Sequence, residues 1–323
     1  YPVCVPSALY LDHAASTPLR PGVLEAMAPH LAGTFGNPSS SHRAGRAARK
    51  ALEDARDLLA SLLGCAPREF CFTSGGTESD NLAILGAVGA LPQDRNTIVT
   101  CATEHPAVLA PCRSLGAKVL PPLPDGRLDP AAFETALTPE VGFASIMVAN
   151  NETGVLHPLL ALSKLCKQKG TLLHTDAVQA VGHVPVDFKA LGVDLLTLTA
   201  HKFGGPRGIG ALLIREGVKL KPLMTGGDHE RGRRPGTENV AGAVGMAEAL
   251  RLALSEKNPV ATLRDRLLKG LQAAFPSLVL HGHPLHRLPQ TLNVSVPGVD
   301  AVTALVALDQ VGLMASGGSA CHT

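Results

Sequence analysis

Tryptophan is absent from the 323-residue sequence, and only 3% of the residues are aromatic. A core without bulky rings has to be packed mainly from Leu, Val, Ile and Ala, and the 45% hydrophobic content can supply them. No apolar run reaches the roughly 18 residues that a membrane span needs, so no membrane association is expected. The net charge is only +2 and no run of basic residues occurs, which excludes a nucleic-acid-binding stripe.

Paired cysteines are also missing. The seven cysteines are an odd number, and none of them forms a C-x-x-C pair. This pattern favours free thiols in a reducing, cytoplasmic location over a disulfide framework, and no metal site is expected. The first residues, Tyr1–Cys4, contain no basic segment, so we expect no secretory signal peptide there.

The length exceeds the usual limit for one hydrophobic core, so we expect two domains. Strand patterns alternate with helix patterns, which predicts an α/β fold with a mostly parallel central sheet. We place the large domain at residues 13–256 and a smaller α+β domain at residues 1–12 and 257–323. The expected strands of the large domain are residues 70–72, 97–100, 118–120, 143–148, 171–176, 194–198 and 211–214. The small domain is expected to contain helices 263–275 and 301–308 and strands 278–280 and 291–296.

The segment from Ser41 to Gly64 has the clearest helical pattern in the chain. Gly64 stands where a C-terminal cap belongs. The helical spacing places eight apolar residues on one face: Ala44, Ala47, Ala51, Leu52, Ala55, Leu58, Leu59 and Leu62.

A lysine follows the apolar strand 194–198. The sequence Thr199-Ala200-His201-Lys202 leads into a glycine-rich turn, and a second apolar run begins at Ala211. A lysine in such a place is partly desolvated, which lowers its pKa and frees its amine for a Schiff base. The alternative from these residues alone is a solvated lysine that ends a strand.

A second turn of small residues, Thr73 to Asn81, joins strand 70–72 to a helix. The N-terminus of such a helix is an anion site, although an ordinary capped helix start has the same composition. His105, Asn151, Asp176 and Lys202 each lie at or just past the end of a different apolar strand, and ligands bind there in parallel sheets. Lysine, aspartate, histidine and anion turn together are the components of a pyridoxal phosphate site. Singly, Asp176 is also explained as a cap or turn residue, and His105 as a structural one.

The order of seven motifs carries a resemblance to a known family. These are Thr73-Ser74-Gly75-Gly76-Thr77-Glu78-Ser79-Asp80-Asn81, Glu104-His105, Asn150-Asn151-Glu152, Asp176-Ala177-Val178-Gln179, His201-Lys202, His229-Glu230-Arg231-Gly232 and Ser319-Ala320-Cys321. Together they resemble the class V aminotransferase-like family of fold type I pyridoxal phosphate enzymes, specifically the cysteine desulfurases, with selenocysteine lyase as a close relative. The resemblance extends from about Tyr10 to Thr323.

The resemblance implies a role for each matching residue. Lys202 is implied as the Schiff-base lysine, Asp176 as the partner of the ring nitrogen, Gln179 as the partner of the ring hydroxyl and His105 as the ring-stacking proton shuttle. Asn151 is implied near ring and substrate, and Cys321 as the nucleophile that takes the sulfur as a persulfide. The implied phosphate ligands are Gly76, Thr77, Thr199, His201 and, from a partner subunit, Thr237. Family members also have a substrate-binding arginine in a segment beyond the position of Thr323.

We therefore expect conversion of L-cysteine to L-alanine by a homodimer. The sulfur is expected to go to an acceptor protein, such as an iron–sulfur scaffold, or to another sulfur-transfer pathway. Selenocysteine lyase, acting on L-selenocysteine, is the first alternative, because the segments Leu313–Ser316, Cys321–His322 and Arg234–Asn239 look closer to that enzyme. An aminotransferase is the second alternative, and it would need no mobile cysteine. A non-catalytic binding scaffold is the third.

Overall fold

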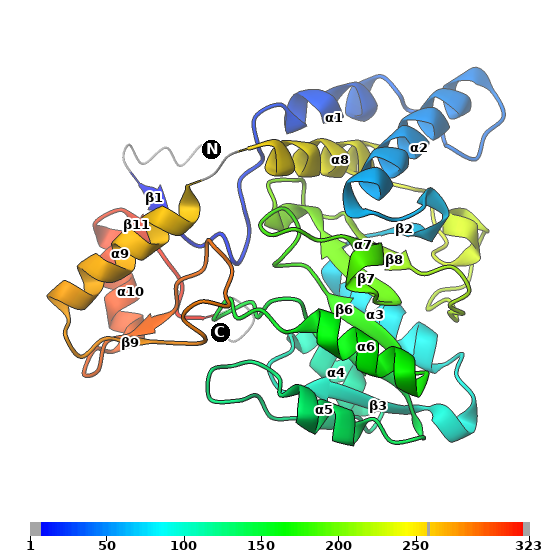
Figure 1. Ribbon diagram of the computed structural model, residues 1–323. Coiled ribbons are helices and arrows are strands. Elements are labelled where there is room, and N and C mark those ends of the chain that lie inside the picture. The colour runs from blue at the N-terminus through cyan, green and yellow to red at the C-terminus, as the bar shows by residue number, and fades with distance from the viewer. Residues whose placement is uncertain (1–7, 257–258, 319–323) are drawn as a thin grey trace.

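The computed structural model describes residues 8–256 and 259–318, which form a larger and a smaller lobe (Figure 1). The larger lobe contains a seven-stranded sheet with helices on both faces. The smaller lobe contains the two last helices and short strands from both ends of the described chain. In this part of the chain, no helix is both long and apolar enough to cross a bilayer.

The central sheet has the strand order β2-β8-β7-β6-β5-β3-β4. Only β8 runs antiparallel to its neighbours β2 and β7, so the prediction of a mostly parallel sheet is confirmed. The strand predicted over residues 143–148 is β5, which ends at Ser145, three residues earlier than predicted. The strands are β2 (Phe70–Thr73), β3 (Thr97–Cys101), β4 (Lys118–Leu120), β5 (Val141–Ser145), β6 (Leu172–Asp176), β7 (Leu195–Thr199) and β8 (Gly210–Ile214).

Successive strand residues face opposite sides of the sheet and enter two separate apolar clusters. On β2, Phe70 and Phe72 belong to one cluster, whereas Cys71 between them belongs to the other. The larger cluster packs under α2 (Arg43–Leu63), α5 (Pro130–Ala136), α6 (Leu159–Lys169), α7 (Phe188–Leu191) and α8 (Val240–Ser255). The other packs under α3 (Gly76–Val88) and α4 (Pro106–Ser114). Both consist mainly of Leu, Val, Ile and Ala with a few Phe, as the aromatic-poor composition predicts.

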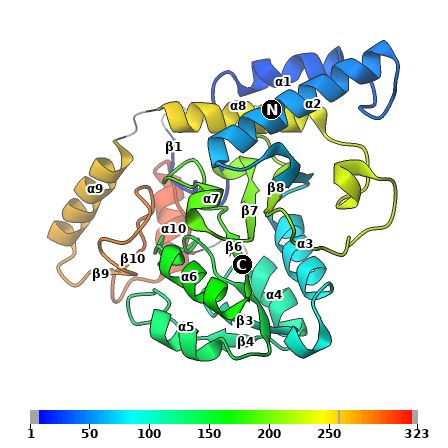
Figure 2. The same ribbon diagram turned by 45° about the vertical axis from the view of Figure 1, so that its right-hand side comes forward.

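Helix α2 lies with α1 (Val23–Ala32) and α8 in one layer at the top of the molecule (Figures 1 and 2). The predicted cap is confirmed, because Gly64 adopts φ 68° and its N–H bonds Ala60 O. The predicted buried face is partly wrong. Leu52, Ala55 and Leu59 of the predicted face are buried, but Ala47 is exposed, and the buried stripe also includes Gly45 and Ala48, which were not predicted. Helix α2 packs against α8, and the spacing of apolar residues alone does not show which small residues lie in that contact.

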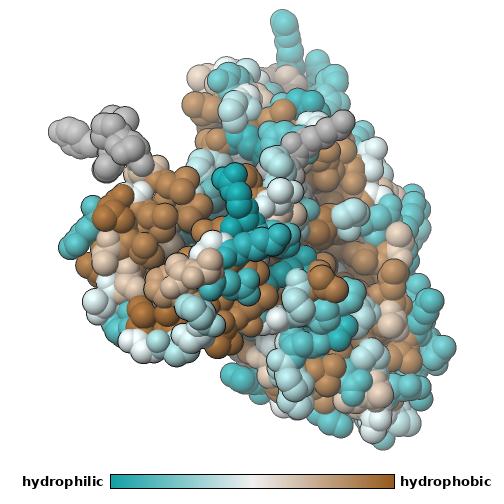
Figure 3. Space-filling model, turned by 60° about the vertical axis from the view of Figure 1, so that its left-hand side comes forward, coloured by the Kyte–Doolittle hydropathy of each residue, from teal (hydrophilic) through white to brown (hydrophobic). Residues whose placement is uncertain are grey.

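The smaller lobe is held together by short elements. They are α9 (Val260–Ala274), α10 (Ala301–Gln310), an antiparallel pair of β9 (Val279–Leu280) and β10 (Val294–Ser295), and a parallel pair of β1 (Leu9–Tyr10) and β11 (Leu313–Met314). The strand predicted over residues 291–296 therefore has only two paired residues. Neither α9 nor α10 contains a buried residue, and apolar side chains cover this lobe in Figure 3. We propose that residues 1–12 and 257–323 form one domain, since β1 pairs with β11.

Candidate active site

The candidate site lies where β6 and β7 end and α3 begins. Asp176 is the last residue of β6 and is buried, while Lys202 follows β7 in the short helix η3 (Ala200–Lys202) and is half-buried. The structure therefore brings the end of one parallel strand beside the lysine that follows the next. This is the crevice that the strand-end pattern predicts.

Lys202 is held by the N-terminal segment that crosses the crevice. Its Nζ donates to the carbonyl oxygen of Ala14 and to that of Ala15, the latter at 2.9 Å. Gln179 Nε2 donates to the same Ala14 carbonyl at 3.0 Å. Lysine and glutamine thus meet at one backbone oxygen, and Ala14 is a site residue that no sequence pattern predicted.

The N-terminal segment is itself fixed to the lysine turn. Thr17 N–H and Oγ1 donate to His201 O at 2.9 and 2.8 Å, and Thr17 Oγ1 accepts from Gly204 N at 2.8 Å. On the other side, His183 Nε2 lies 3.0 Å from Lys202 O. These contacts position the Lys202 backbone from two sides.

The pKa of the Asp176 carboxyl is strongly perturbed. Burial raises the pKa of its carboxyl to about 6, against the opposing effects of the Val178 N–H and Lys202. The Val178 N–H donates to Asp176 Oδ1 at 2.8 Å. A cationic partner stabilises a carboxylate strongly in this setting, because a buried charge without a counter-charge is unfavourable.

Helix α3 begins beside the lysine turn with Gly76 and Thr77 as its first residues. No side chain caps this N-terminus among the described residues, so its N–H groups and positive dipole end suit an anion. Gly210 on β8 has to be a glycine, because a Cβ there would lie 2.7 Å from the backbone of Gly75. The β8 backbone therefore presses closely against the turn that opens the anion site.

Thr199 and His201 border the same turn. Thr199 Oγ1 lies 3.1 Å from His201 Nδ1 and donates to Ile209 O at 3.1 Å. A Cβ on Gly75 would lie 3.8 Å from Thr199 Oγ1, which places the threonine beside the start of α3. Burial lowers the pKa of His201 to about 4, with Lys202 and Arg207 acting in the same direction, so the imidazole is neutral at pH 7.

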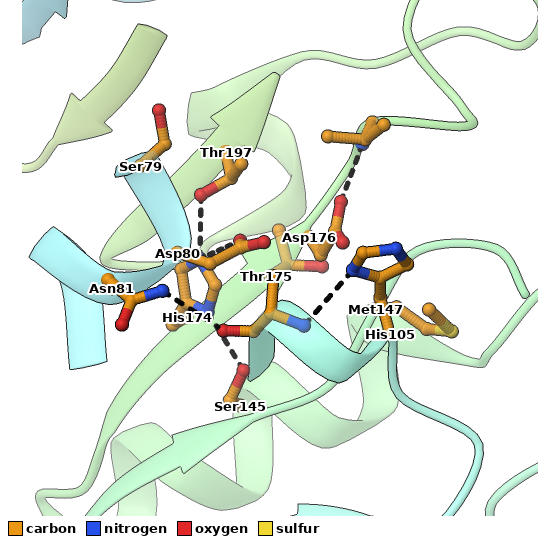
Figure 4. A network of polar contacts seen from close by, with 12 residues as sticks. Ser79, Asp80, Asn81, His105, Ser145, Met147, His174, Thr175, Asp176 and Thr197 are labelled. Carbon is orange, nitrogen blue, oxygen red and sulfur yellow. Dashed lines mark hydrogen bonds and ion pairs between the residues drawn. The ribbon is translucent and has the colours of Figure 1, made fainter. Parts of the chain in front are cut away.

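His105 comes to the site from the beginning of α4 and lies beside Asp176 in Figure 4. Its Nδ1 accepts the Ala107 N–H at 3.1 Å, so the neutral ring carries its proton on Nε2. Asn81 joins the two helix starts, since its Nδ2 donates to Thr77 O at 2.9 Å and to Ala107 O at 3.4 Å.

Asn151 lies half-buried in the turn after β5, and Asn150 organises that turn. Asn150 Oδ1 accepts from Glu152 N–H at 3.1 Å, Thr153 N–H at 2.8 Å and Thr153 Oγ1 at 2.9 Å. Its Nδ2 donates to Thr103 O at 2.9 Å, which links the turn to the segment before His105.

Two predicted residues are not brought to this group. Thr237 is exposed on the loop 226–239, so its expected contact with a partner subunit stays a prediction. Cys321 lies outside the described residues. The described cysteines Cys65, Cys71, Cys101, Cys112 and Cys166 are all buried and free. Within residues 8–256 and 259–318, no group of three or more His, Cys, Asp and Glu side chains could hold a metal ion.

Comparison with known proteins places this arrangement in a family. Residues 9–323 match the aminotransferase class-V family. A cysteine desulfurase IscS of Dictyoglomus turgidum is 46% identical over 98% of this chain and 82% of its own. A cysteine desulfurase of Cereibacter sphaeroides is 47% identical over 97% of this chain and 83% of its own.

Solved structures agree with the sequence relatives. A NifS-like protein superposes with a TM-score of 0.92 at 36% identity and covers 96% of this chain and 87% of its own. SspA in complex with cysteine has a TM-score of 0.85 at 31% identity over 98% of this chain and 90% of its own. The chain belongs to the class V aminotransferase family, which is pyridoxal phosphate-dependent and has the type I fold. The family's cysteine desulfurases are the relatives that it matches along nearly its full length.

The residues present fit the cofactor. The uncapped start of α3 suits its phosphate, the buried Asp176 carboxylate suits a protonated ring nitrogen, and the Lys202 amine suits its aldehyde.

Proposed function

We propose that the protein is a cysteine desulfurase that converts L-cysteine to L-alanine and transfers the sulfur to Cys321. The observation that carries the proposal is the meeting of Lys202 and Asp176 beside the uncapped N-terminus of α3. The names of the relatives favour cysteine over selenocysteine and do not favour an aminotransferase.

Each residue has a defined task in this proposal. When bound, pyridoxal phosphate supplies an electron sink for the bonds at the substrate's α-carbon. Lys202 anchors the cofactor and moves the α-proton, and Asp176 keeps the ring nitrogen protonated. His105 provides a flat face and a titratable nitrogen.

The phosphate is held by the start of α3 and its neighbours. Gly76 and Thr77 present N–H groups, and Thr199 and His201 add a hydroxyl and an imidazole at the same turn. Gln179 would hold the ring hydroxyl of the bound cofactor, and Asn151 would lie near the ring and the substrate.

Sulfur transfer requires a thiol that can move. The Cys321 thiolate attacks the sulfur of the substrate, an S–S bond forms and the substrate's C–S bond breaks. The electron pair of that bond stays on the β-carbon, which takes a proton and becomes the methyl group of alanine. The five described cysteines are buried, and burial raises the pKa of the thiols of Cys65, Cys71, Cys112 and Cys166 to about 12, so they are poor nucleophiles at neutral pH.

We further propose a cytoplasmic homodimer in which Thr237 of each copy completes the phosphate site of the other. Support comes from exposed apolar side chains around α1, above all Phe35, which is 87% exposed. The buried free thiols are consistent with a reducing compartment. The sulfur then passes to an acceptor protein such as an iron–sulfur scaffold. Sedimentation that finds an active monomer would contradict the dimer.

The anchor can be tested directly. Borohydride reduction of the yellow holoprotein should leave the cofactor mass on the peptide that contains Lys202. Lys202→Ala should lose this adduct, whereas Lys164→Ala, which changes an exposed lysine on α6, should keep it. An adduct on another residue in the unchanged protein would refute the assignment.

A further inference from the structure

Three carboxyl side chains are buried together behind the proposed cofactor site. Asp80 of α3 is 1% exposed, Glu104 after β3 is 4% exposed and Asp176 is 6% exposed. Burial raises the pKa of all three, and the charge of Asp176 adds to the rise at Asp80 and Glu104. Three negative charges in such a place would be very costly without cations.

His174 on β6 joins this cluster to the sheet, two residues before Asp176 on the same face of the strand. Its ring is fully buried. Nδ1 lies 2.8 Å from Ser145 Oγ, and Nε2 lies 3.0 Å from Thr197 Oγ1 and 3.6 Å from Asp80 Oδ1 (Figure 4). Both hydroxyls can donate or accept, so they are compatible with either tautomer of the ring.

No cation in the described part of the chain balances Asp80. Among the described residues its only ion-pair partner is His174, and burial lowers the pKa of that imidazole to about 3, so the ring is neutral. Asp80 Oδ1 is buried and accepts no hydrogen bond from any described residue, and the Thr197 hydroxyl only partly opposes the rise in the pKa of this carboxyl. An ionised carboxylate would leave this buried oxygen unsatisfied, which is unfavourable, whereas a carboxylic acid can turn its O–H toward the imidazole nitrogen.

Glu104 is in a comparable position. Its Oε1 accepts the Met147 N–H at 2.7 Å, and Oε2 is buried with no hydrogen bond to a described residue. Asp176 differs from both because a cation, Lys202, lowers the pKa of its carboxyl, and like Glu104 it also accepts a backbone N–H, that of Val178. Asp176 is therefore the carboxyl of the three that is best placed to carry a charge.

We propose that Asp80 is a neutral carboxylic acid whose O–H faces His174 Nε2, 3.6 Å from Oδ1, and that the negative charge of the cluster therefore stays on Asp176. Asp80 touches neither cofactor nor substrate in this proposal and is a positioning residue that acts through Asp176. A charge on Asp80 would raise the pKa of Asp176 further and weaken its hold on the ring nitrogen. The role of Asp176 rests on the proposed function, but the protonation state of Asp80 does not.

The protonation state can be read in the apoprotein. At about pH 8, well above the ordinary pKa of an aspartate, infrared spectra should show a protonated carboxyl C=O band that shifts on ¹³C-aspartate labelling. Labelling separates Asp80 from Glu104, and Asp176 is ionised at that pH. Asp80→Asn should remove the band, and Asp94→Asn, a change at an exposed residue, should leave it. If Asp80→Asn fails to fold, the spectra of the parent protein with and without ¹³C-aspartate still show whether a buried aspartate is protonated.

The consequence for Asp176 is read in the holoprotein. Because asparagine is as neutral as the proposed acid, the pH midpoint of the bound cofactor's visible absorbance should be the same in Asp80→Asn and the parent. An absent aspartate band, or a midpoint that moves when Asp80 becomes asparagine, would overturn the proposal. Failure of the proposed function would look different, since the protein would bind no cofactor while the infrared band remained.

Discussion

Arg56 of α2 and Glu230 form a buried ion pair that ties the loop 226–239 to the sheet. Two parallel hydrogen bonds of 2.8 Å join the guanidinium to the carboxylate, and the side chains are only 3% and 1% exposed. Glu230 Oε2 also accepts the Phe72 N–H at 2.9 Å, and Arg56 Nη1 donates to Phe70 O at 2.9 Å. The pair therefore satisfies backbone groups of β2, the strand that leads into the anion turn.

Arg56→Met should lower the free energy of unfolding by about 3–5 kcal/mol, because it leaves a buried carboxylate without its cation. That is a large share of the roughly 5–15 kcal/mol that stabilises a typical domain. Arg56→Met combined with Glu230→Leu should recover much of the loss, since the unpaired charge is then gone.

Urea unfolding followed by circular dichroism measures these differences. Lys50→Met on the same helix is the matched control, because it breaks the exposed Lys50–Asp54 pair and should change stability by no more than about 1 kcal/mol. If Arg56→Met were as mild as the control, the buried pair would not hold the loop in the way described.

Three further outcomes are expected. The pKa of Asp176 is about 6 in the folded apoprotein and 3.8 ordinarily, so its ionisation costs roughly 3 kcal/mol of stability as pH rises through this range. Apo Asp176→Asn should be more stable than the parent by that amount above about pH 7 and equal to it below about pH 4, and equal stability at both pH values would contradict this. Gly210→Ala should weaken cofactor binding in an absorbance titration, because its Cβ would collide with Gly75, and unchanged affinity would show that the turn adapts freely. Arg231 is exposed with φ 60°, so Arg231→Gly should raise the thermal midpoint, whereas a fall would mean that its side chain makes a stabilising contact.

The sequence predicted the parts of the site that depend on local pattern. The strands of the large domain are short, mostly apolar segments, and the polar residues near their ends mark the site: Asp176 is the last residue of β6, and Lys202 lies in η3, which directly follows β7. A turn of small residues before a helix likewise identifies Gly76 and Thr77. The exact buried face of α2 was not predictable, because it depends on which helix packs against it.

Residues inside the fold were harder to identify. Asp80 and His174 lie within a helix and a strand, and nothing in their spacing shows that they meet behind Asp176. Asp80 and His174 lie close together because α3 packs across β6 and β7, and this tertiary contact is not visible in the local sequence. The antiparallel direction of β8 is also a property of the assembled sheet, since its apolar run fits either direction.

The central claim is the use of Cys321 as sulfur acceptor on the Lys202–Asp176 site. The most direct measurement is alanine released from L-cysteine by holoprotein of the parent and of Cys321→Ser, with Cys166→Ser as a control at a buried thiol. The account predicts one alanine for each sulfur removed by the parent and by the control, and no alanine from a Cys321→Ser protein that is still yellow. Alanine release at the parent rate by Cys321→Ser would contradict it.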